Sequence, residues 1–206
     1  MLNRICGKAD IYNRLSLRDV IELEKARALG PILGVDTTPE SPMNQSDISV
    51  RLLGTDQIQG LAAHLTAAGL PTQDLLQPGR MFYSFHRGET ELGYGGIEGS
   101  GRTRLIRSLV VVPAQRKSGI GTLLLRTLER IAEADGAQSL HLLTTTAPEF
   151  FEARGYAQRD RSQAPKAISS SEEFNSLCST SAVYMVKELG DTNSVSPQVT
   201  RLHGRQ

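Results

Sequence analysis

Hydrophobic and polar residues alternate along four short stretches between residues 48 and 112, and such alternation is typical of β-strands. The stretches are ISVRLL (48–53), MFYSFHR (81–87), ELGYGGIE (91–98) and TRLIRSLVVV (103–112). Glycine-containing turns separate the last three stretches, so we predict that they form an antiparallel meander. Between the first two, Thr55 is placed to cap a helix that has Ile58, Leu61, Ala62 and Leu65 on one face.

The pattern changes to helical spacing after residue 119. A single apolar stripe runs along Ile120, Leu123, Leu124, Leu128 and Ile131, and Gly136 is placed to end this helix. The next apolar stretch, SLHLLTTT (139–146), is reached through a helix, so we expect it to lie parallel to the strand before it. A short helix in APEFFEARG (147–155) and strands in YAQRD (156–160) and SAVYMVKEL (181–189) follow. We therefore predict an α+β fold: a mixed, mostly antiparallel central sheet flanked by helices, with one β-α-β unit.

The first 47 residues differ from the rest of the chain. LSLRDVIELEKARALG (15–30) has the spacing of an amphipathic helix, and VDTTPESPMNQSD (35–47) is polar and contains prolines, as linkers do. We expect residues 1–47 to be a loosely attached extension, residues 48–189 to be the domain, and residues 190–206 to be a polar C-terminal tail. Met43 is a candidate natural start of that domain.

Composition and charge narrow the class of protein. A net charge of +1 over 206 residues gives no bulk attraction to nucleic acid or to an acidic membrane. No apolar run has the length of a membrane span, and the first residues lack the apolar core of a secretory signal. Cys6 and Cys178 fit neither a metal motif nor a disulfide framework. We expect a cytoplasmic protein that uses no metal and has neither nucleic acid nor membrane as a partner.

The junction between residues 109 and 121 carries the strongest chemical signal. A buried strand runs into Pro113, and Arg116, Gly119 and Gly121 follow at the start of the long helix. The N–H groups of a helix start favour anions, and glycine lets a phosphate approach the backbone closely. A dinucleotide fingerprint would need a third glycine in phase, and a P-loop would need Gly-Lys-Ser/Thr; neither is present. The sequence therefore predicts a phosphate-binding loop of another kind.

Three ordered segments resemble the GNAT N-acetyltransferase superfamily: ELGYGGIE, SLVVVPAQRKSGIGTLLL (108–125) with its Q/R-x-x-G-x-G/A pattern, and FFEARGY (150–156). The resemblance extends over about residues 48–188. Within the superfamily, LIRSLVVVPAQR, LHLLTTTAPEFFEARGY and EEFNSLCSTSAVYM resemble bacterial arsenic-resistance N-acetyltransferases. LLTTTA together with the later FF and GY is also similar to the acetyltransferase domain of N-acetylglutamate synthases.

The resemblance implies a GNAT-like fold whose co-substrate is acetyl-CoA. The pyrophosphate would lie on the loop from Arg116 to Gly121, with Thr122 beside it, and the pantetheine arm would pair with the strand at Leu109 to Val111. The implied cofactor-binding residues are Leu109, Val110, Val111, Arg116, Lys117, Ser118, Gly119, Ile120, Gly121 and Thr122.

The same resemblance implies transfer of an acetyl group to the amine of a small amino acid-like substrate, in arsenic resistance or detoxification. An N-acetylglutamate synthase-like activity, a peptide- or protein-modifying acetyltransferase and a non-catalytic acyl-CoA-binding sensor remain alternatives. A homodimer is left open.

The proton-transfer groups of the family are missing from their usual positions. The tyrosine that often serves as general acid corresponds to Phe151, and a carboxylate base on the strand would fall near Leu105. A backbone N–H at a strand bulge near Val110 or Val111 would stabilise the oxyanion. We assign no catalytic side chain from the sequence.

Two arginines are candidate acceptor-binding residues. Arg107 shares a strand face with Leu105 and Leu109 in an alternating pattern, where it suits a carboxylate, phosphinate or arsinate. The alternative is a surface arginine paired with Glu98. Arg161 is a weaker second anion clamp, with plain surface charge as the alternative. We interpret Cys178 as a packed cysteine and His141 as structural.

Overall fold

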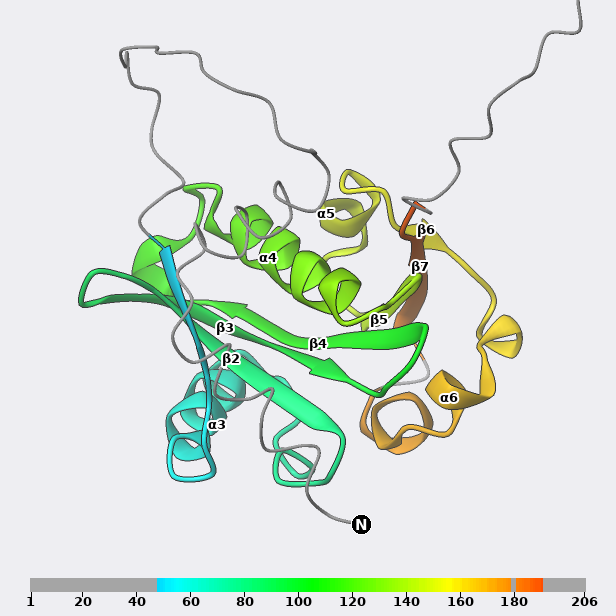
Figure 1. Ribbon diagram of the computed structural model, residues 1–206, viewed down its shortest axis with the longest axis horizontal. Helices are drawn as coiled ribbons and strands as arrows, with labels where there is room; N and C mark the ends of the chain where they lie inside the picture. Colours follow the sequence, from blue (N-terminus) through cyan, green and yellow to red (C-terminus); the bar gives the residue numbers. More distant parts are fainter. Residues whose placement is uncertain (1–47, 179–180, 191–206) are drawn as a thin grey trace, which may run out of the picture.

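The computed structural model describes residues 48–178 and 181–190, which form one seven-stranded sheet with helices on both faces (Figure 1). The strand order is β1-β2-β3-β4-β5-β7-β6. The expected N-terminal helix, the linker, Met43 and most of the polar tail lie outside the described residues.

The sheet is antiparallel except at one pair of neighbours. The strands are β1 (Ile48–Leu52), β2 (Arg80–Arg87), β3 (Thr90–Glu98), β4 (Thr103–Val111), β5 (Ser139–Thr144), β6 (Ala157–Gln158) and β7 (Val183–Glu188). Only β4 and β5 are parallel, and the helix between them completes the predicted β-α-β unit. The predicted mixed, mostly antiparallel sheet is confirmed.

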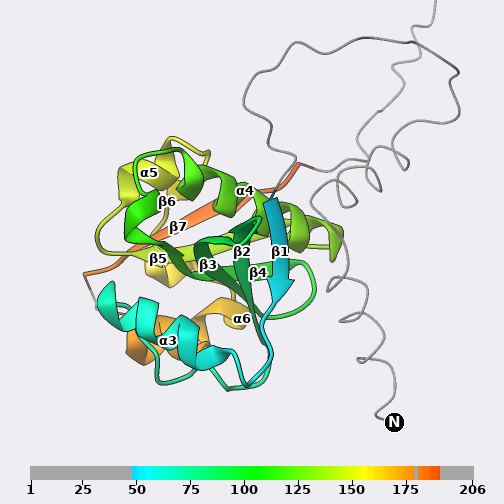
Figure 2. The same cartoon turned by 90° about the vertical axis from the view of Figure 1, so that its left-hand side faces the viewer.

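The helices form two layers, one on each face of the sheet. One layer holds α4 (Ile120–Ala134) and α5 (Pro148–Glu152). The other holds α3 (Ile58–Ala67), α6 (Lys166–Ser169) and the short helix η4 (Glu173–Leu177) (Figure 2). Two further turns of 3₁₀ helix are η2 (Pro113–Gln115) and η3 (Arg161–Gln163). No helix within the described ranges has the length and apolar character that crossing a membrane requires.

The main core lies between the sheet and α4. Leu124, Leu125 and Leu128 are fully buried there against apolar residues of β2, β3 and β5. The β3 glycines allow this close packing: a Cβ on Gly95 would stand 2.6 Å from Leu128 Cδ1. Larger residues at this position would push α4 away from the sheet.

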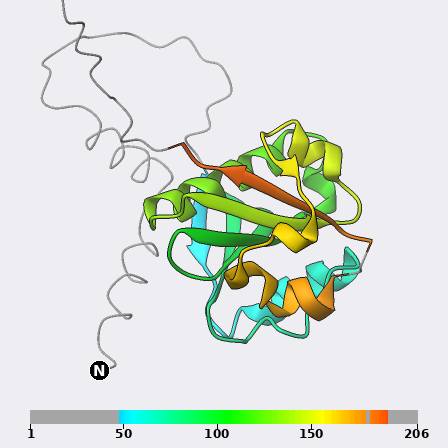
Figure 3. The ribbon, with the colours of Figure 1, turned by 90° about the vertical axis from the view of Figure 1, so that its right-hand side faces the viewer.

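The opposite face carries two smaller apolar clusters. One surrounds α3 and includes Leu61, Leu65 and Val110. The other joins β4, β7 and the β6–β7 connection through Leu105, Ile168, Phe174 and Tyr184. The connection itself, which contains η3, α6 and η4, was not predicted from the sequence; it packs beneath the sheet on the same side as α3 (Figure 3).

Candidate active site

β4 and β5 pair over a short distance and then separate. Their parallel pairing is limited to Thr103–Ser139, Arg104–Leu140 and Leu105–His141. β4 nevertheless continues to Val111 and β5 continues to Thr144. The sheet therefore opens beyond Leu105, and the later half of β4 presents an edge that β5 does not cover.

A β-bulge interrupts β4 just beyond the point of separation. Gly96 pairs with Arg107 and Tyr94 pairs with Val110, so Ser108 and Leu109 together oppose the single residue Gly95. Ser108 adopts the left-handed φ of 54°, which a serine rarely does outside such irregularities.

The bulge reverses the order of faces along the strand. Arg107 and Val110 point toward the α3 and α6 side, whereas Leu109 packs against the core under α4. The expectation that Arg107 and Leu109 share a face is wrong, because strict alternation fails at the extra residue.

Backbone groups of β4 point into the opening. The N–H of Val112 donates to the carbonyl of Leu92 at 3.0 Å, so by alternation the N–H and C=O of Val111 point away from β3. Arg116 Nε donates to the carbonyl oxygen of Val111 at 3.2 Å from that side. Two backbone N–H groups were expected as oxyanion donors. The N–H of Val111 points into the opening, whereas the N–H of Val110 points toward β3.

The loop between β4 and α4 exposes a row of N–H groups. Lys117 and Gly119 both have left-handed φ, 64° and 77°, and the hydroxyl of Ser118 donates to the Gln115 carbonyl at 2.6 Å. The first bonds into the helix run from Thr122 and Leu123 to the Gly119 carbonyl. No described residue accepts a hydrogen bond from the N–H groups of residues 117–121, so this loop, which we call the anion seat, has donors to offer to an anion.

The two loop glycines are needed for different reasons. Gly119 has free space around it, and its left-handed φ is what favours glycine. Gly121 has an ordinary φ, but a Cβ there would stand 3.4 Å from the Phe150 ring and 3.7 Å from Val111 Cγ2. Gly121 therefore lets α5 approach the beginning of α4.

Arg154 is a second guanidinium at the helix start, which sequence reasoning missed. Its Nε and Nη2 lie 3.0 and 2.5 Å from the Thr122 hydroxyl oxygen, and its guanidinium carbon lies 3.7 Å from the Phe150 ring centre. It lies within FFEARGY, so its proximity to the loop between β4 and α4 follows from the short α5 segment folding against α4. Arg154 adds positive charge beside the exposed N–H groups.

Arg107 lies in a buried network of carboxylates. Its two terminal nitrogens hold the Asp74 carboxylate at 2.7 and 2.8 Å, one of them also contacts Glu98, and Nε lies 2.8 Å from Glu173 Oε2. The residue is 3% exposed. Burial alone would lower the pKa of Arg107, but Glu173, Asp74 and Glu98 outweigh it, and the pKa is raised.

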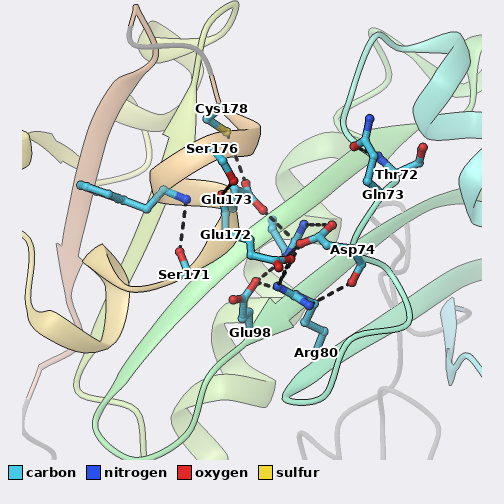
Figure 4. A network of polar contacts seen from close by, with 12 residues as sticks. Thr72, Gln73, Asp74, Arg80, Glu98, Ser171, Glu172, Glu173, Ser176 and Cys178 are labelled. Atoms are coloured by element: carbon cyan, nitrogen blue, oxygen red, sulfur yellow. Dashed lines mark hydrogen bonds and ion pairs between the residues drawn. The ribbon is translucent and has the colours of Figure 1, made fainter.

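Arg80 is the second cation of the network (Figure 4). It contacts Asp74 Oδ2 at 3.1 Å, Glu98 Oε2 at 3.2 Å and the more exposed Glu172 Oε2 at 3.2 Å. The network thus joins three segments distant in sequence: the loop after α3, strands β2 to β4, and the beginning of η4.

Burial dominates the titration of Glu173. It raises the pKa of this carboxyl to about 7; Glu98 and Asp74 raise it too, while Arg107 and Arg80 oppose the shift. The Cys178 thiol lies 3.9 Å from Glu173 Oε1, and burial together with Glu173 raises the pKa of that thiol to about 12.

These contacts correct the interpretation of Arg107. Its guanidinium is occupied by three carboxylates, so it is not an open clamp for an acceptor anion. Glu98 is a partner, as the alternative expected, but the pair is buried rather than on the surface. Arg161 lies with its guanidinium carbon 4.5 Å from the Phe174 ring centre and donates to the Phe174 carbonyl, so it braces η4.

The remaining candidates are packed side chains. Phe151 and Leu105 are buried in apolar clusters. His141 lies against the Tyr184 hydroxyl at 2.6 Å and the Ser139 hydroxyl at 3.0 Å, and burial lowers its pKa to about 4. It is therefore neutral and held on both ring nitrogens. Within the described residues, no group of histidines, cysteines and carboxylates is arranged to hold a metal ion.

Residues 78–158 match the family model of the acetyltransferase (GNAT) domain. This range contains the bulged β4, the anion seat and α5. No curated protein matches the chain.

Solved structures share the fold. N-acetylglutamate synthase from Neisseria gonorrhoeae, crystallised with coenzyme A and L-arginine, is 19% identical with a TM-score of 0.58, covering 70% of this chain and 34% of its own. Rv2747 from Mycobacterium tuberculosis, in complex with CoA and NLQ, is 18% identical with a TM-score of 0.55, over 68% and 98% of the two chains. A putative acyl-CoA N-acyltransferase from Klebsiella pneumoniae is 20% identical with a TM-score of 0.53, over 71% and 100%.

This chain therefore spans about a third of the gonococcal synthase and almost the whole of the smaller proteins. The predicted GNAT-like fold is confirmed.

Proposed function

We propose that the protein transfers an acetyl group from acetyl-CoA to the amine of a small amino acid-like substrate, as the match of residues 78–158 to the acetyltransferase (GNAT) domain suggests. One observation carries the proposal: the opening between β4 and β5 is lined by outward-pointing backbone groups of Val111 and leads to the exposed N–H groups of residues 117–121.

The proposed cofactor-binding residues come from β4, the loop that follows it and the segment just after α5. The N–H groups of residues 117–121 would receive the pyrophosphate, with the side chains of Arg116, Lys117 and Arg154 supplying positive charge. The exposed edge of β4 from Leu109 to Val111 would pair with the pantetheine amides. Val110 contributes packing on the α3 side rather than a backbone hydrogen bond to the cofactor.

The residues of this chain supply positioning and electrostatic stabilisation for the transfer. The Val111 N–H is aimed at the opening, where it would donate to the thioester oxygen as negative charge develops on it. Holding amine and thioester together supplies much of the acceleration. The α4 side is closed by the buried Leu124 and Leu128, so the acceptor would approach from the face of α3 and α6.

The nature of the acceptor is inferred from charge. In the ion-pair network on this face, three buried carboxylates (Asp74, Glu98 and Glu173) contact two guanidiniums (Arg80 and Arg107), which favours a substrate with an ammonium group. With Arg107 occupied, an acceptor carboxylate needs a partner other than this residue. A role in arsenic resistance or detoxification stays part of the proposal and rests on the resemblance of three sequence segments.

Two alternatives have a specific observation in their favour. The fold similarity to the gonococcal N-acetylglutamate synthase favours glutamate as acceptor. The apolar Phe151, at the position of the usual acid, favours a sensor that binds acyl-CoA without turning it over.

Thiol release from acetyl-CoA, measured with common L-amino acids, phosphinothricin and an organoarsenical amino acid analogue, tests these proposals. Turnover with one of these amines, lost in Gly119→Asp, supports the enzyme. Calorimetric binding of acetyl-CoA without turnover of any amine would favour the sensor, and absence of binding would overturn both.

A further inference from the structure

Glu173 lies beside β4, close to the last β4–β5 pair. The last β4–β5 pair is Leu105 with His141, and Arg107 is the next β4 residue on the α6 side. Glu173 contacts Arg107 Nε, and its neighbour Phe174 packs in the same cluster as Leu105. The carboxylate therefore lies on the α6 side of β4, the face from which we propose that the acceptor approaches, near the point where β4 and β5 part.

The network around Glu173 is short of one positive charge. Asp74, Glu98 and Glu173 are buried or nearly so, and two guanidiniums, Arg80 and Arg107, face them. Glu172, the fourth carboxylate, is 54% exposed at its side chain and is solvated. Buried charges require compensation, so one buried carboxylate calls for a proton or an external cation.

Glu173 is the most weakly held of the three buried carboxylates. Asp74 and Glu98 each contact both arginines, whereas Arg107 is the one cation that Glu173 contacts among the described residues. That contact is 2.8 Å long, but within the described part of the chain the Nε–H makes no hydrogen bond. The other oxygen faces the Cys178 thiol at 3.9 Å, and a thiol is a weak donor. One oxygen of Glu173 is thus available to a stronger donor.

We propose that Glu173 is the general base that takes the proton from the ammonium group of the acceptor. The inference rests on the acetyltransferase function proposed above and assigns a residue to a step that the sequence left without one.

The proposed step balances in atoms and charge. The ammonium gives one N–H proton to the Glu173 carboxylate and becomes a neutral amine. The nitrogen lone pair then forms a bond to the thioester carbonyl carbon, and the C–S bond breaks with its electron pair on sulfur. A second N–H proton goes to that sulfur, which yields the amide and the free thiol, and Glu173 returns its proton to solvent.

The environment of Glu173 suits this exchange. Its pKa of about 7 is close to neutral pH, where a base of this kind is most effective. The charged and titratable groups facing it are Arg107, Glu98, Asp74, Arg80 and Cys178. The neighbouring Glu172 pairs with Arg80, and Arg161 donates to the Phe174 carbonyl and opposes the raised pKa of Cys178. His141 is neutral with both ring nitrogens engaged, and the Cys178 thiol stays protonated, so neither competes for this role.

The test compares Glu173→Gln with Glu172→Gln, which changes a neighbouring, exposed carboxylate that pairs with Arg80. Thiol release is measured from pH 6 to pH 9.5 with acetyl-CoA and the amines of the panel above that the wild type acetylates. Glu173→Gln should lower kcat/KM for the amine by about 10²–10⁴-fold at pH 7. Its affinity for acetyl-CoA should stay within about twofold of wild type, since the anion seat is elsewhere. Glu172→Gln should resemble wild type in both.

The pH profile separates a base from a structural residue. The wild-type kcat/KM should level off above the pKa of Glu173. The kcat/KM of Glu173→Gln should instead follow the concentration of free amine and keep rising with pH. The difference between its kcat/KM and that of the wild type should therefore shrink as pH increases. A deficit that is constant across pH, or wild-type activity in Glu173→Gln, would overturn the assignment.

Two further results are decisive. If Glu173→Gln does not fold by circular dichroism, Glu173→Asp replaces it: retained pH shape with reduced kcat supports the base, and unchanged kcat overturns it. Wild-type protein that binds acetyl-CoA but acetylates no amine would overturn the proposed function and this inference together, an outcome distinct from failure of Glu173 alone.

Discussion

Arg107 grips both carboxylate oxygens of Asp74, at 2.7 and 2.8 Å, and so ties β4 to the loop that follows α3. Both side chains are almost completely buried. The pair belongs to a network in which carboxylates outnumber guanidiniums, and this imbalance has a measurable consequence.

Removing a cation from the network should cost more stability than removing an anion. Arg107→Met leaves three buried carboxylates facing Arg80 alone and should lower the free energy of unfolding by about 3–5 kcal/mol. Asp74→Asn leaves Glu98 and Glu173 facing two arginines, a balanced set, and should cost clearly less. Urea unfolding measures both, with Glu172→Gln as a control that should change stability by less than about 1 kcal/mol because its partner contact is exposed. Equal losses for Arg107→Met and Asp74→Asn would contradict the charge imbalance.

The anion seat should be sensitive to charge at Gly119. Gly119→Asp places a carboxylate among the exposed N–H groups and should abolish acetyl-CoA binding in calorimetric titration. The matched control is Gly136→Asp at the other end of α4: Gly136 also has a left-handed φ, 89°, and open space around it. Both variants should lose similar stability, but only the first should lose binding. If folded Gly119→Asp keeps its affinity for acetyl-CoA, the cofactor does not bind at this loop.

The close approach of α4 to β3 should appear as coupling between Gly95 and Leu128. Gly95→Ala places a Cβ 2.6 Å from Leu128 Cδ1 and should cost about 1–3 kcal/mol by overpacking. In the background of Leu128→Ala, which removes that methyl group, the same change should cost much less. Urea unfolding of the four proteins in this double-mutant cycle gives the coupling energy. If the two losses of stability are additive, the residues are not coupled, and α4 moves away from the sheet at no cost in free energy.

Stability should fall as pH rises through the titration of Glu173. The pKa of this carboxyl is about 7 in the folded protein against an ordinary value of 4.5, so between these values the folded state binds more protons than the unfolded state. The linkage relation then gives a loss on the order of 3 kcal/mol from pH 4.5 to pH 7, which is complete above pH 7. Urea unfolding at several pH values measures this slope; Glu173→Gln should reduce it, and Glu172→Gln should keep it. If the slope of the free energy of unfolding against pH is unchanged in Glu173→Gln, other groups cause the pH dependence.

The sheet and α4 were predictable because they repeat a pattern. Hydrophobic and polar residues alternate along β1 to β4, and hydrophobic residues recur with helical spacing along α4. Leu125 is a buried position of α4 that was not among the predicted ones. The loop was predictable because Gly119 and Gly121 stand at the junction of a strand and a helix.

The features that were not predictable depend on contacts between distant residues or on elements too short to show a period. Nothing in the sequence shows that Ser108 adopts a positive φ, because serine occurs in all kinds of backbone conformation. The bulge and the resulting orientation of Arg107 were therefore not predicted. α6 and η4 have four and five residues, fewer than two helical turns. The partners of Arg107 come from Asp74 and Glu173, which no local pattern connects.

The span of that network along the chain has a kinetic consequence. Asp74 lies early in the domain and Glu173 lies near its end, so their shared contacts with Arg107 can form only after β4, the loop after α3 and η4 have come together. Closing these loops costs conformational entropy, so we expect the contacts to form after the transition state for folding. Weakening them should then speed unfolding while leaving the folding rate nearly unchanged. The lifetime of the folded domain would depend on the same side chains that line the face from which we propose that the acceptor approaches.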